Sequence, residues 1–349
     1  MMKSKVMRAA LAAGTSAALV LGGGAVASAN PKVRTPAIRQ ISAASNVVSV
    51  KGDTFALING DNVDPFFFSI WAGAIAGAKK YGIKIIEQAP TTFDYTQQLS
   101  LLDDELAKHV NGIIFSPDSV FGFAQFYQQA HAAGIPVVDV NDTEAQEKNN
   151  PNVLSFAGSS SIPLGALAAQ AMAKLVGGKG LVTVINSIAG GIGDVERGSG
   201  FLNKIKASYP KMRVLAEQYD MDDVSKADQI ATDEMQANPS LEGIYGVDSF
   251  TGQGVGTAVK AAGKAGKVKV VAIDAEPQEV ALMKQGVIQA LIAQQPYEMG
   301  VTGVQNIVLA LEGKTSHVVR SLILGPIMVT PQNLNTPYIQ TVIYPANEP

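Results

Sequence analysis

The chain has 349 residues, which suggests roughly two domains at about 150 residues each. Apolar residues make up 47% and charged residues 16%, a composition typical of a globular protein with a large buried core. The formal net charge of -3 gives no reason to expect nucleic acid or an anionic membrane surface as a partner.

The first 29 residues have the pattern of a secretory signal peptide. Lys3, Lys5 and Arg8 precede an apolar stretch that ends in Ala27-Ser28-Ala29, with small residues at the positions that a signal peptidase reads. We therefore predict cleavage after Ala29. A membrane anchor is the weaker alternative, because the stretch is rich in Gly and Ala and is interrupted by Thr and Ser, which makes it a poor bilayer span.

Residues 30–48 are mainly polar and unpatterned, and we predict a flexible leader there. The chain contains no cysteine, so disulfides cannot stabilise it and its stability must come from its core. It also lacks the acylated cysteine of a lipoprotein. Together with the signal peptide, this predicts a protein that is free in the periplasm or secreted.

From Thr54 onward, apolar runs of strand length alternate with amphipathic stretches of about 15 residues that predict helices. Most of the runs are nearly continuous in Val, Ile and Leu, as in parallel strands that are covered on both faces. The alternation predicts right-handed βαβ units. The predicted strands are 54–58, 84–88, 112–116, 136–140, 181–185, 212–216, 243–247, 269–273 and 288–293.

The alternation pauses once, and the pause divides the chain into two consecutive α/β halves. Residues 144–160 contain a cluster of Asn and Pro and are predicted to be a loop. A predicted helix over 161–176 and a predicted strand over 181–185 then restart the pattern. The tail after Pro326 contains several further prolines and is predicted to be an extended strap along the surface.

Hydrogen-bonding side chains follow nearly every predicted strand. Ligands of open α/β sheets bind beyond the carboxyl ends of the strands, so these side chains are candidates for a binding site. For any one of them helix N-capping is an equally good explanation, since Asp, Asn and Ser are common caps, but it explains the whole set less well. The candidates are Asp61, Asp64, Ser116, Asn141, Asp142, Arg197, Tyr219, Asp248, Asp274 and Gln294.

Three consecutive phenylalanines follow Asp64 and Pro65, which have the pattern of a helix cap and a first helical residue. A helix buries one stripe, so Phe66, Phe67 and Phe68 cannot all face the same core. We interpret Phe66 and Phe67 as facing a ligand and Phe68 as packing in the core. Aromatic rings beside Asp and Asn suit a sugar or polyol, which offers C–H faces to the rings and hydroxyls to the polar groups.

Several short motifs occur in an order and spacing that are more informative than any one of them. They are DPFF (64–67), SP (116–117), IPVVDVND (135–142), ERGSGF (196–201), Asp248, VVAIDAEP (270–277) and IAQQP (292–296). In this arrangement the chain resembles the type I periplasmic solute-binding proteins of ABC importers, in the ribose-binding branch. The resemblance extends from about Thr54 to Val329.

The resemblance implies an α/β fold of two doubly wound parallel-sheet lobes joined by a three-segment hinge. One lobe would comprise residues 49–158 and 296–322, and the other residues 159–295 and 323–349. A small molecule would bind between the lobes of a monomeric protein, with the permease subunits of an ABC importer as the membrane partner. The implied pocket positions are Asp64, Phe66, Phe67, Ser116, Asn141, Asp142, Arg197, Tyr219, Asp248, Asp274 and Gln294.

Two departures from the family pattern carry chemical information. Pentose binders tend to have Asp-Arg in place of Asn141-Asp142, and Asn in place of Asp64 and Asp248. An ionised Asp only accepts hydrogen bonds, whereas Arg only donates them, so the pocket loses a donor and gains acceptors. Arg197 is the one obvious counter-charge. We expect a neutral sugar or polyol, a cyclitol or an amine, and not a carboxylate, because buried charge is costly unless it is paired.

The sequence gives little support for an enzymatic function. His109, His131 and His317 are far apart and lack metal-ligand spacing, and no serine has a nucleophile-elbow pattern. The Gly-rich loop at 189–198 fits neither a dinucleotide fingerprint nor a P-loop, so we expect no cofactor and no metal. A sugar-responsive repressor would need DNA-binding helices where the signal-peptide pattern lies. An exported receptor that feeds a membrane sensor stays open as an alternative to transport.

Overall fold

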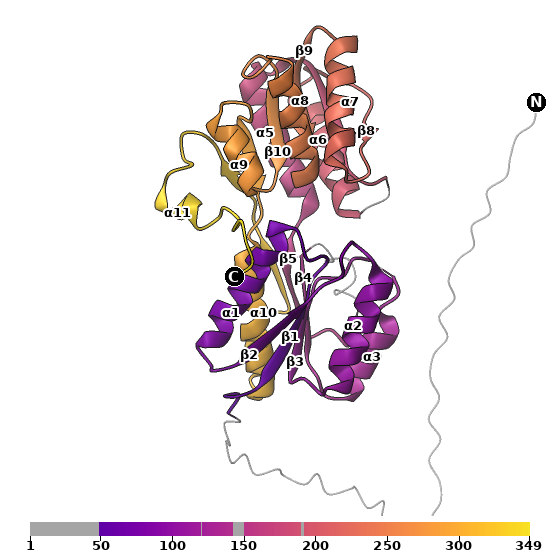
Figure 1. Cartoon of the computed structure of the whole chain (residues 1–349), viewed down its shortest axis with the longest axis vertical. Helices are drawn as coiled ribbons and strands as arrows, with labels where there is room; N and C mark the ends of the chain where they lie inside the picture. The colour runs from indigo at the N-terminus through magenta and orange to yellow at the C-terminus, as the bar shows by residue number, and fades with distance from the viewer. Residues whose placement is uncertain (1–48, 120, 142–149, 190–191) are drawn as a thin grey trace, which may run out of the picture. The chain divides into compact units, whose positions relative to one another are not determined.

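The computed structural model describes residues 49–119, 121–141, 150–189 and 192–349. The predicted signal peptide and leader lie outside the described residues, and so does Asp142. The described residues form one compact unit, which contains two parallel-stranded sheets (Figure 1).

The first sheet has the strand order β12-β5-β4-β3-β1-β2, and all of its strand pairs are parallel. Its strands are β1 (Thr54–Ile58), β2 (Lys84–Gln88), β3 (Gly112–Phe115), β4 (Val137–Asn141), β5 (Ser155–Ser159) and β12 (Ser321–Leu324). Its helices are α1 (Pro65–Lys79), α2 (Tyr95–Ala107), α3 (Ala124–Ala132) and α10 (Pro296–Leu311). Helices α1 and α10 pack together on one face, while α2 and α3 cover the other.

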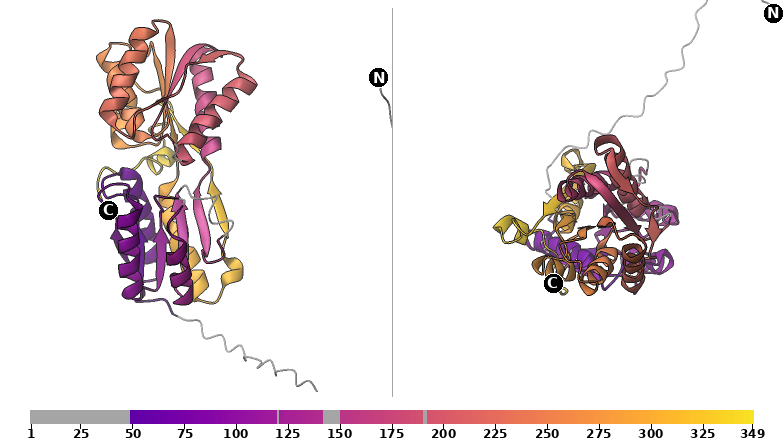
Figure 2. Two further views of the ribbon diagram at one scale, coloured as in Figure 1. Left: turned by 90° about the vertical axis from the view of Figure 1, so that its right-hand side faces the viewer. Right: turned by 90° about the horizontal axis from the view of Figure 1, so that it is seen from above.

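The second sheet has the order β13-β11-β10-β9-β6-β7, with β8 also paired to β6, and only β13 is antiparallel to its neighbour. Its strands are β6 (Lys179–Asn186), β7 (Lys211–Val214), β8 (Gln218–Tyr219), β9 (Leu241–Gly246), β10 (Lys269–Ile273), β11 (Ala290–Ala293) and β13 (Ile327–Val329). Its helices are α5 (Ser161–Val176), α6 (Ile192–Ser208), α7 (Val224–Ala237), α8 (Ser249–Ala261) and α9 (Pro277–Lys284). Helices α5 and α6 lie on one face, and α7, α8 and α9 lie on the other (Figure 2).

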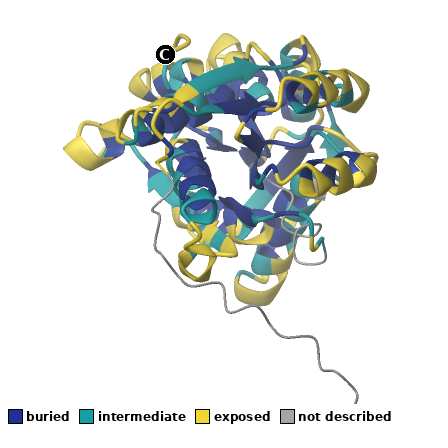
Figure 3. Cartoon of the chain, turned by 90° about the horizontal axis from the view of Figure 1, so that it is seen from below, coloured by how far each residue is buried: buried dark blue, intermediate teal, exposed yellow. Residues whose placement is uncertain are grey.

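Four apolar clusters fill the spaces between the sheets and their helices, one on each sheet face. The central strands are buried, the edge strands are partly exposed, and the outward faces of the helices are exposed (Figure 3). This is the arrangement that nearly continuous Val, Ile and Leu runs predict for parallel strands. None of the helices in the described part of the chain is long and apolar enough to cross a membrane.

Most of the predicted strands are confirmed in both sheets. The loop predicted over 144–160 is wrong at its C-terminal end, where a strand forms instead. Residues Ser155–Ser159 form β5, which pairs with β4 on one side and β12 on the other. The sequence SFAGS lacks the β-branched residues that mark the other strands. Gly158 is required there because a Cβ would clash with the Asn141 carbonyl, and the close packing replaces the usual strand signal.

The chain passes between the two sheets three times, after β5, after β11 and after β12. The third passage lies between Leu324 and Ile327, slightly later than expected, because Ile323 and Leu324 still pair with Gly158 and Ser159 of the first sheet. Ser159 therefore also belongs to the first sheet.

The C-terminal tail is more than a surface strap. Leu334 and Ile339 are buried in a core cluster of the second lobe, whereas Tyr344 is buried in a core cluster of the first. The ring of Tyr344 packs edge-on against Phe66 with a centroid separation of 5.8 Å. The prolines of the tail limit its backbone without keeping its apolar side chains out of the core.

We predict that Gly73→Ala destabilises the protein by roughly 1–3 kcal/mol, the usual cost of overpacking. A Cβ at Gly73 would clash with the backbone carbonyl of Tyr297, where α1 meets α10, and no rotamer change relieves a backbone clash. Urea denaturation measures the effect. Gly325→Ala is the matched control, because nothing lies within 4 Å of the added Cβ. Equal unfolding free energies for the two variants would contradict the close helix crossing.

Candidate ligand-binding site

A cavity of about 440 Å³ is lined by residues that follow strands of both sheets. In each sheet the strand order reverses beside the first strand of the lobe, between β1 and β3 and between β6 and β9. Loops at such reversal points diverge and leave a crevice at the carboxyl ends of the strands. The loops after these four strands all contribute to the cavity wall, so the topology itself positions the site.

The structure brings most of the predicted site residues to this cavity. Segments that follow strands of both sheets supply them, which explains why they are scattered along the sequence. The predicted residues on the cavity wall are Asp64, Phe66, Phe67, Asn141, Arg197, Asp248, Asp274 and Gln294.

Asp61, Ser116 and Tyr219 do not line the cavity, and Asp142 lies outside the described residues. The Asp61 carboxylate accepts backbone N–H groups of Val63 at 2.9 Å and Asp64 at 2.8 Å, so it shapes the turn before α1. The Ser116 hydroxyl accepts the Asn141 side-chain amide at 3.3 Å. For these two side chains and that of Tyr219, contact with the ligand stays a prediction.

The predicted start of α1 is confirmed, but the burial of the three phenylalanines differs from the prediction. Asp64 accepts the Phe66 backbone N–H at 2.7 Å as the N-cap, and Pro65 is the first helical residue. Phe66 and Phe67 are 5% and 2% exposed and belong to the core as well as the cavity wall. Phe68 is only partly buried and lies outside the core clusters, so its predicted core packing is wrong. The first turn of α1 points residues 66 and 67, not 68, toward the sheet.

Sequence reasoning missed three aromatic and three acidic residues of the wall, Phe93, Phe121, Phe250, Asp118, Asp194 and Asp222. It considered the residues directly after each strand, whereas these lie farther along the loops or in the first helical turn. The runs SPDS at 116–119 and DMDD at 220–223 were the available signal for two of the acids. Nothing in the local pattern distinguished the rings from core residues.

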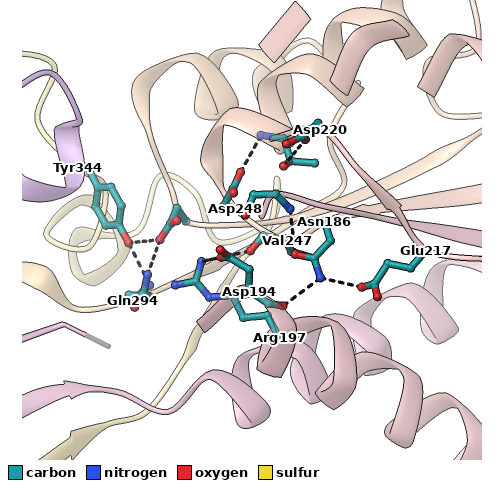
Figure 4. Close-up of polar contacts among 12 residues, drawn as sticks. Asn186, Asp194, Arg197, Glu217, Asp220, Val247, Asp248, Gln294 and Tyr344 are labelled. Carbon is teal, nitrogen blue, oxygen red and sulfur yellow. Dashed lines mark hydrogen bonds and ion pairs between the residues drawn. The ribbon is translucent and has the colours of Figure 1, made fainter. Parts of the chain in front are cut away.

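A hydrogen-bond node at Asp274 organises one wall of the cavity. Its Oδ1 accepts the Tyr344 hydroxyl at 2.8 Å and the Gln294 side-chain amide at 2.9 Å, and the Gln294 backbone N–H donates to the Tyr344 oxygen at 3.2 Å (Figure 4). These donors fix the orientation of the Gln294 amide. Its Oε1 is buried and has no hydrogen-bond partner among the described residues, so it is placed to accept from a ligand.

A second network positions the start of α6. The Asn186 side-chain amide donates to the Asp194 carbonyl at 3.2 Å and to Glu217 Oε1 at 2.7 Å, and Tyr219 donates to Glu217 Oε2 at 3.0 Å. Tyr219 therefore supports the site indirectly. Arg197 is 5% exposed, with Nη1 3.6 Å from Asp194 Oδ1 and 3.3 Å from the carbonyl of Val247.

Three wall residues adopt backbone conformations that L-amino acids rarely occupy. Asn141, Asp222 and Asp274 have φ values of 80°, 61° and 78°. Such conformations cost about 1–3 kcal/mol each and persist where the surrounding structure holds them in place. The concentration of this strain on the cavity wall is typical of a functional site.

Carboxyl groups outnumber cations on the wall. Six aspartates and one arginine, Arg197, are present among the described residues. The negative charge of Glu276 acts on Asp64, and that of Asp248 acts on Asp222, so acids of the wall repel one another.

Burial is the main cause of the raised carboxyl pKa values. Desolvation, then the charge of Glu276, raises the pKa of Asp64 well above its usual range. Desolvation, then the charge of Asp248, raises the pKa of Asp222 to about 8. Desolvation also raises the pKa of Asp118 to about 8. No group of three or more His, Cys, Asp or Glu in the described part of the chain could hold a metal ion.

The family follows from comparison with known proteins. A model of the periplasmic binding protein domain matches residues 55–315. The chain belongs to this family. The match covers most of both lobes, and the predicted type I periplasmic binding protein fold is confirmed by it and by solved structures.

Relatives and solved structures of this family are similar over most of the chain. The D-allose-binding periplasmic protein of Escherichia coli (strain K12) is 30% identical over 247 residues, which cover 69% of this chain and 79% of that protein. The xylitol-binding protein of Mycolicibacterium smegmatis is 27% identical over 214 residues, which cover 60% of this chain and 58% of that protein. An ABC transporter solute-binding protein from Agrobacterium vitis, bound with α-D-tagatopyranose, is 30% identical with a TM-score of 0.77 over 84% of this chain and 99% of that chain.

We predict that the ligand-free protein melts at a higher temperature at pH 6 than at pH 9. The pKa values of Asp118 and Asp222 are raised to about 8 in the folded protein, so the folded state binds more protons than the unfolded state. Their contribution to stability is fully present below the unfolded pKa of about 4 and is lost as pH rises through the folded pKa. Thermal unfolding across this pH range measures it.

The control for this pH dependence compares two variants. The double variant D118N/D222N should have a flatter profile than the wild type, because both titrating groups are gone. Asp103→Asn, at an exposed position of α2, should keep the wild-type profile. A D118N/D222N profile as steep as that of the wild type would show that other groups cause the pH dependence.

Proposed function

We propose that the mature protein is an extracytoplasmic binding protein that captures a neutral sugar or polyol and delivers it to an ABC importer in the membrane. The observation that carries the proposal is one cavity that combines aromatic rings with hydrogen-bonding side chains from both sheets. Binding without chemical conversion is part of the proposal. Allose, xylitol and tagatose in the names of family relatives support a hydroxylated ligand.

The wall chemistry suits a molecule with both apolar and polar faces. The half-buried ring of Phe250 and the edges of Phe66 and Phe67 offer contact area to the C–H faces of such a ligand. The Gln294 Oε1 accepts a hydroxyl, and the Arg197 guanidinium donates to a ring or hydroxyl oxygen. A wall that combines aromatic rings with convergent polar groups is typical of small-molecule sites.

The partner and the location follow from family membership and from the first residues. We infer that a signal peptide directs the chain across the membrane and is cleaved after Ala29, and that the mature protein is a monomer in the periplasm. The permease subunits of an ABC importer are the proposed partner, because periplasmic location and ABC transport both occur in the names of its relatives. Hinge closure around the ligand is a known behaviour of periplasmic binding proteins and enters here by family analogy.

A thermal-shift panel of aldoses, alditols, cyclitols and aldonic acids tests the proposal. A ligand that binds only the folded state raises the melting temperature with concentration, by an amount set by its dissociation constant. We expect at least one neutral sugar or polyol to do so, and small-angle scattering of that complex to show a smaller radius of gyration. A panel in which no hydroxylated compound shifts the melting temperature would reject the proposal. Binding without uptake of that compound in cells would favour the membrane-sensor alternative.

Phe250 and Phe66 should differ in their contributions to stability and to ligand binding. Phe66 packs against Phe67 and Tyr344 with ring separations of 5.4 Å and 5.8 Å, so Phe66→Ala should lower the unfolding free energy by roughly 3–5 kcal/mol. Phe250 is half-buried on the cavity wall, so Phe250→Ala should cost only about 1 kcal/mol of stability. The same change should weaken binding of the panel ligand roughly tenfold through the lost aromatic contact.

Urea denaturation and titration calorimetry separate these two effects. Phe66→Ala provides the comparison for a ring that belongs mainly to the core. Wild-type affinity in Phe250→Ala would remove this ring from the site, and a stability loss equal to that of Phe66→Ala would make it a core residue.

A further inference from the structure

The acidic residues of the cavity are unequally neutralised. Arg197 lies 3.6 Å from Asp194, and its charge partly offsets the desolvation that raises the pKa of Asp274. Asp222 and Asp248, in contrast, form no ion pair within 4 Å among the described residues, although both lie on the cavity wall. The Thr251 backbone N–H donates to Asp248 Oδ1 at 2.7 Å, but neither acid is paired with a basic side chain among the described residues.

The surroundings of Asp222 add negative charge. Asp194 from α6, Asp220 from the loop after β8 and Asp248 at the start of α8 all face it, and each raises its pKa. Asp220 already accepts the Thr251 hydroxyl at 2.7 Å and the Asp222 backbone N–H at 2.9 Å. The positive charge of Lys226 in α7 lowers the pKa of Asp220 only slightly. A cation that entered the cavity would meet a set of acids here.

Two other wall groups also lack partners, and both point to a ligand with hydrogen-bond donors. Gln294 is 2% exposed and its Oε1, which can only accept, has no hydrogen-bond partner among the described residues. Ser187 is 1% exposed, and its hydroxyl is equally without a partner there. Buried polar atoms in folded proteins are almost always satisfied, so these atoms are left for a bound molecule.

We propose that the ligand carries a protonated amine on a hydroxylated skeleton, as an amino-polyol or amino sugar does, and that its ammonium group binds between Asp222 and Asp248. An ammonium group has three donors and a full positive charge, so it can donate to both acids, and it displaces the proton that the raised pKa keeps on Asp222 at pH 7. The hydroxyls of the skeleton reach Gln294 Oε1 and the Ser187 hydroxyl. The nearby ring of Phe250, the second residue of α8, adds an aromatic face toward a cation. This inference rests on the proposed function and specifies its ligand.

Titration calorimetry with matched compounds tests the inference at pH 7. The set is D-glucitol, 1-amino-1-deoxy-D-glucitol and D-gluconate, with D-glucose and D-glucosamine as the cyclic pair. We expect each amine to bind at least about tenfold more tightly than its neutral partner, and gluconate to bind weakest. The amines should also release a proton on binding, which appears as a difference in heat between phosphate and Tris buffers. The neutral compounds should release none.

Two charge-removing variants locate the subsite. Asp222→Asn should abolish the preference for the amine and its proton release. Asp118→Asn, which removes a wall carboxyl from the first lobe, should retain the preference. Thermal unfolding and retained binding of the neutral compound show that each variant is folded.

The outcomes separate this inference from the proposed function. Neutral compounds that bind more tightly than the amines would overturn the cationic ligand and leave the sugar-binding proposal standing. An amine preference that survives in Asp222→Asn would overturn the assigned subsite. Failure of the whole set, together with failure of the thermal-shift panel, would reject both proposals.

Discussion

The hydrogen bonds that converge on Asp274 hold together the parts of the chain that form the cavity. This carboxylate follows β10, and it receives donors from Gln294, at the passage from β11 to α10, and from Tyr344 in the C-terminal tail. The Tyr344 ring then packs on Phe66 in the core of the first lobe. Hydrogen bonds to a charged acceptor are roughly twice as strong as neutral ones, and an unpaired buried carboxylate is costly. The node therefore fixes the Gln294 amide and links the tail to both lobes.

The burial that strengthens these hydrogen bonds also makes the other acids of the cavity wall destabilise the folded protein when no ligand is bound. Burial and then the charge of Asp248 raise the pKa of Asp222, and burial and then the charge of Glu276 from the opposite lobe raise the pKa of Asp64. Two of the wall acids also sit in strained backbone conformations. A protein selected only for stability would replace these groups by apolar side chains of similar volume. Their presence is explained if ligand binding supplies the missing partners, which also links ligand affinity to pH.

The fold was largely predictable because its signals are local. Strands β1, β2 and β10 begin and end where the apolar runs do, and the strand ends together with the phenylalanine run identify eight residues of the cavity wall. The failures have a shared cause. Strand β5 was missed because close packing at Gly158 replaces the usual β-branched residues, and Phe68 was misplaced because the direction of a helix start depends on the sheet beside it. Asp118 and Asp222 were missed because loop length shifts a residue away from its strand end.

The sequence by itself determined the alternation of strands and helices, the two halves, and which residues reach the carboxyl ends of the strands. These properties depend on hydrophobic periodicity and turn chemistry, which act over a few residues. Only the tertiary structure decided which carboxyls lie close together, which of them have raised pKa values, and which polar atoms are left for a ligand. Those outcomes depend on burial and on distances between groups far apart in the chain, such as Asp64 and Glu276. Electrostatic energies change steeply with both, so no local pattern encodes them.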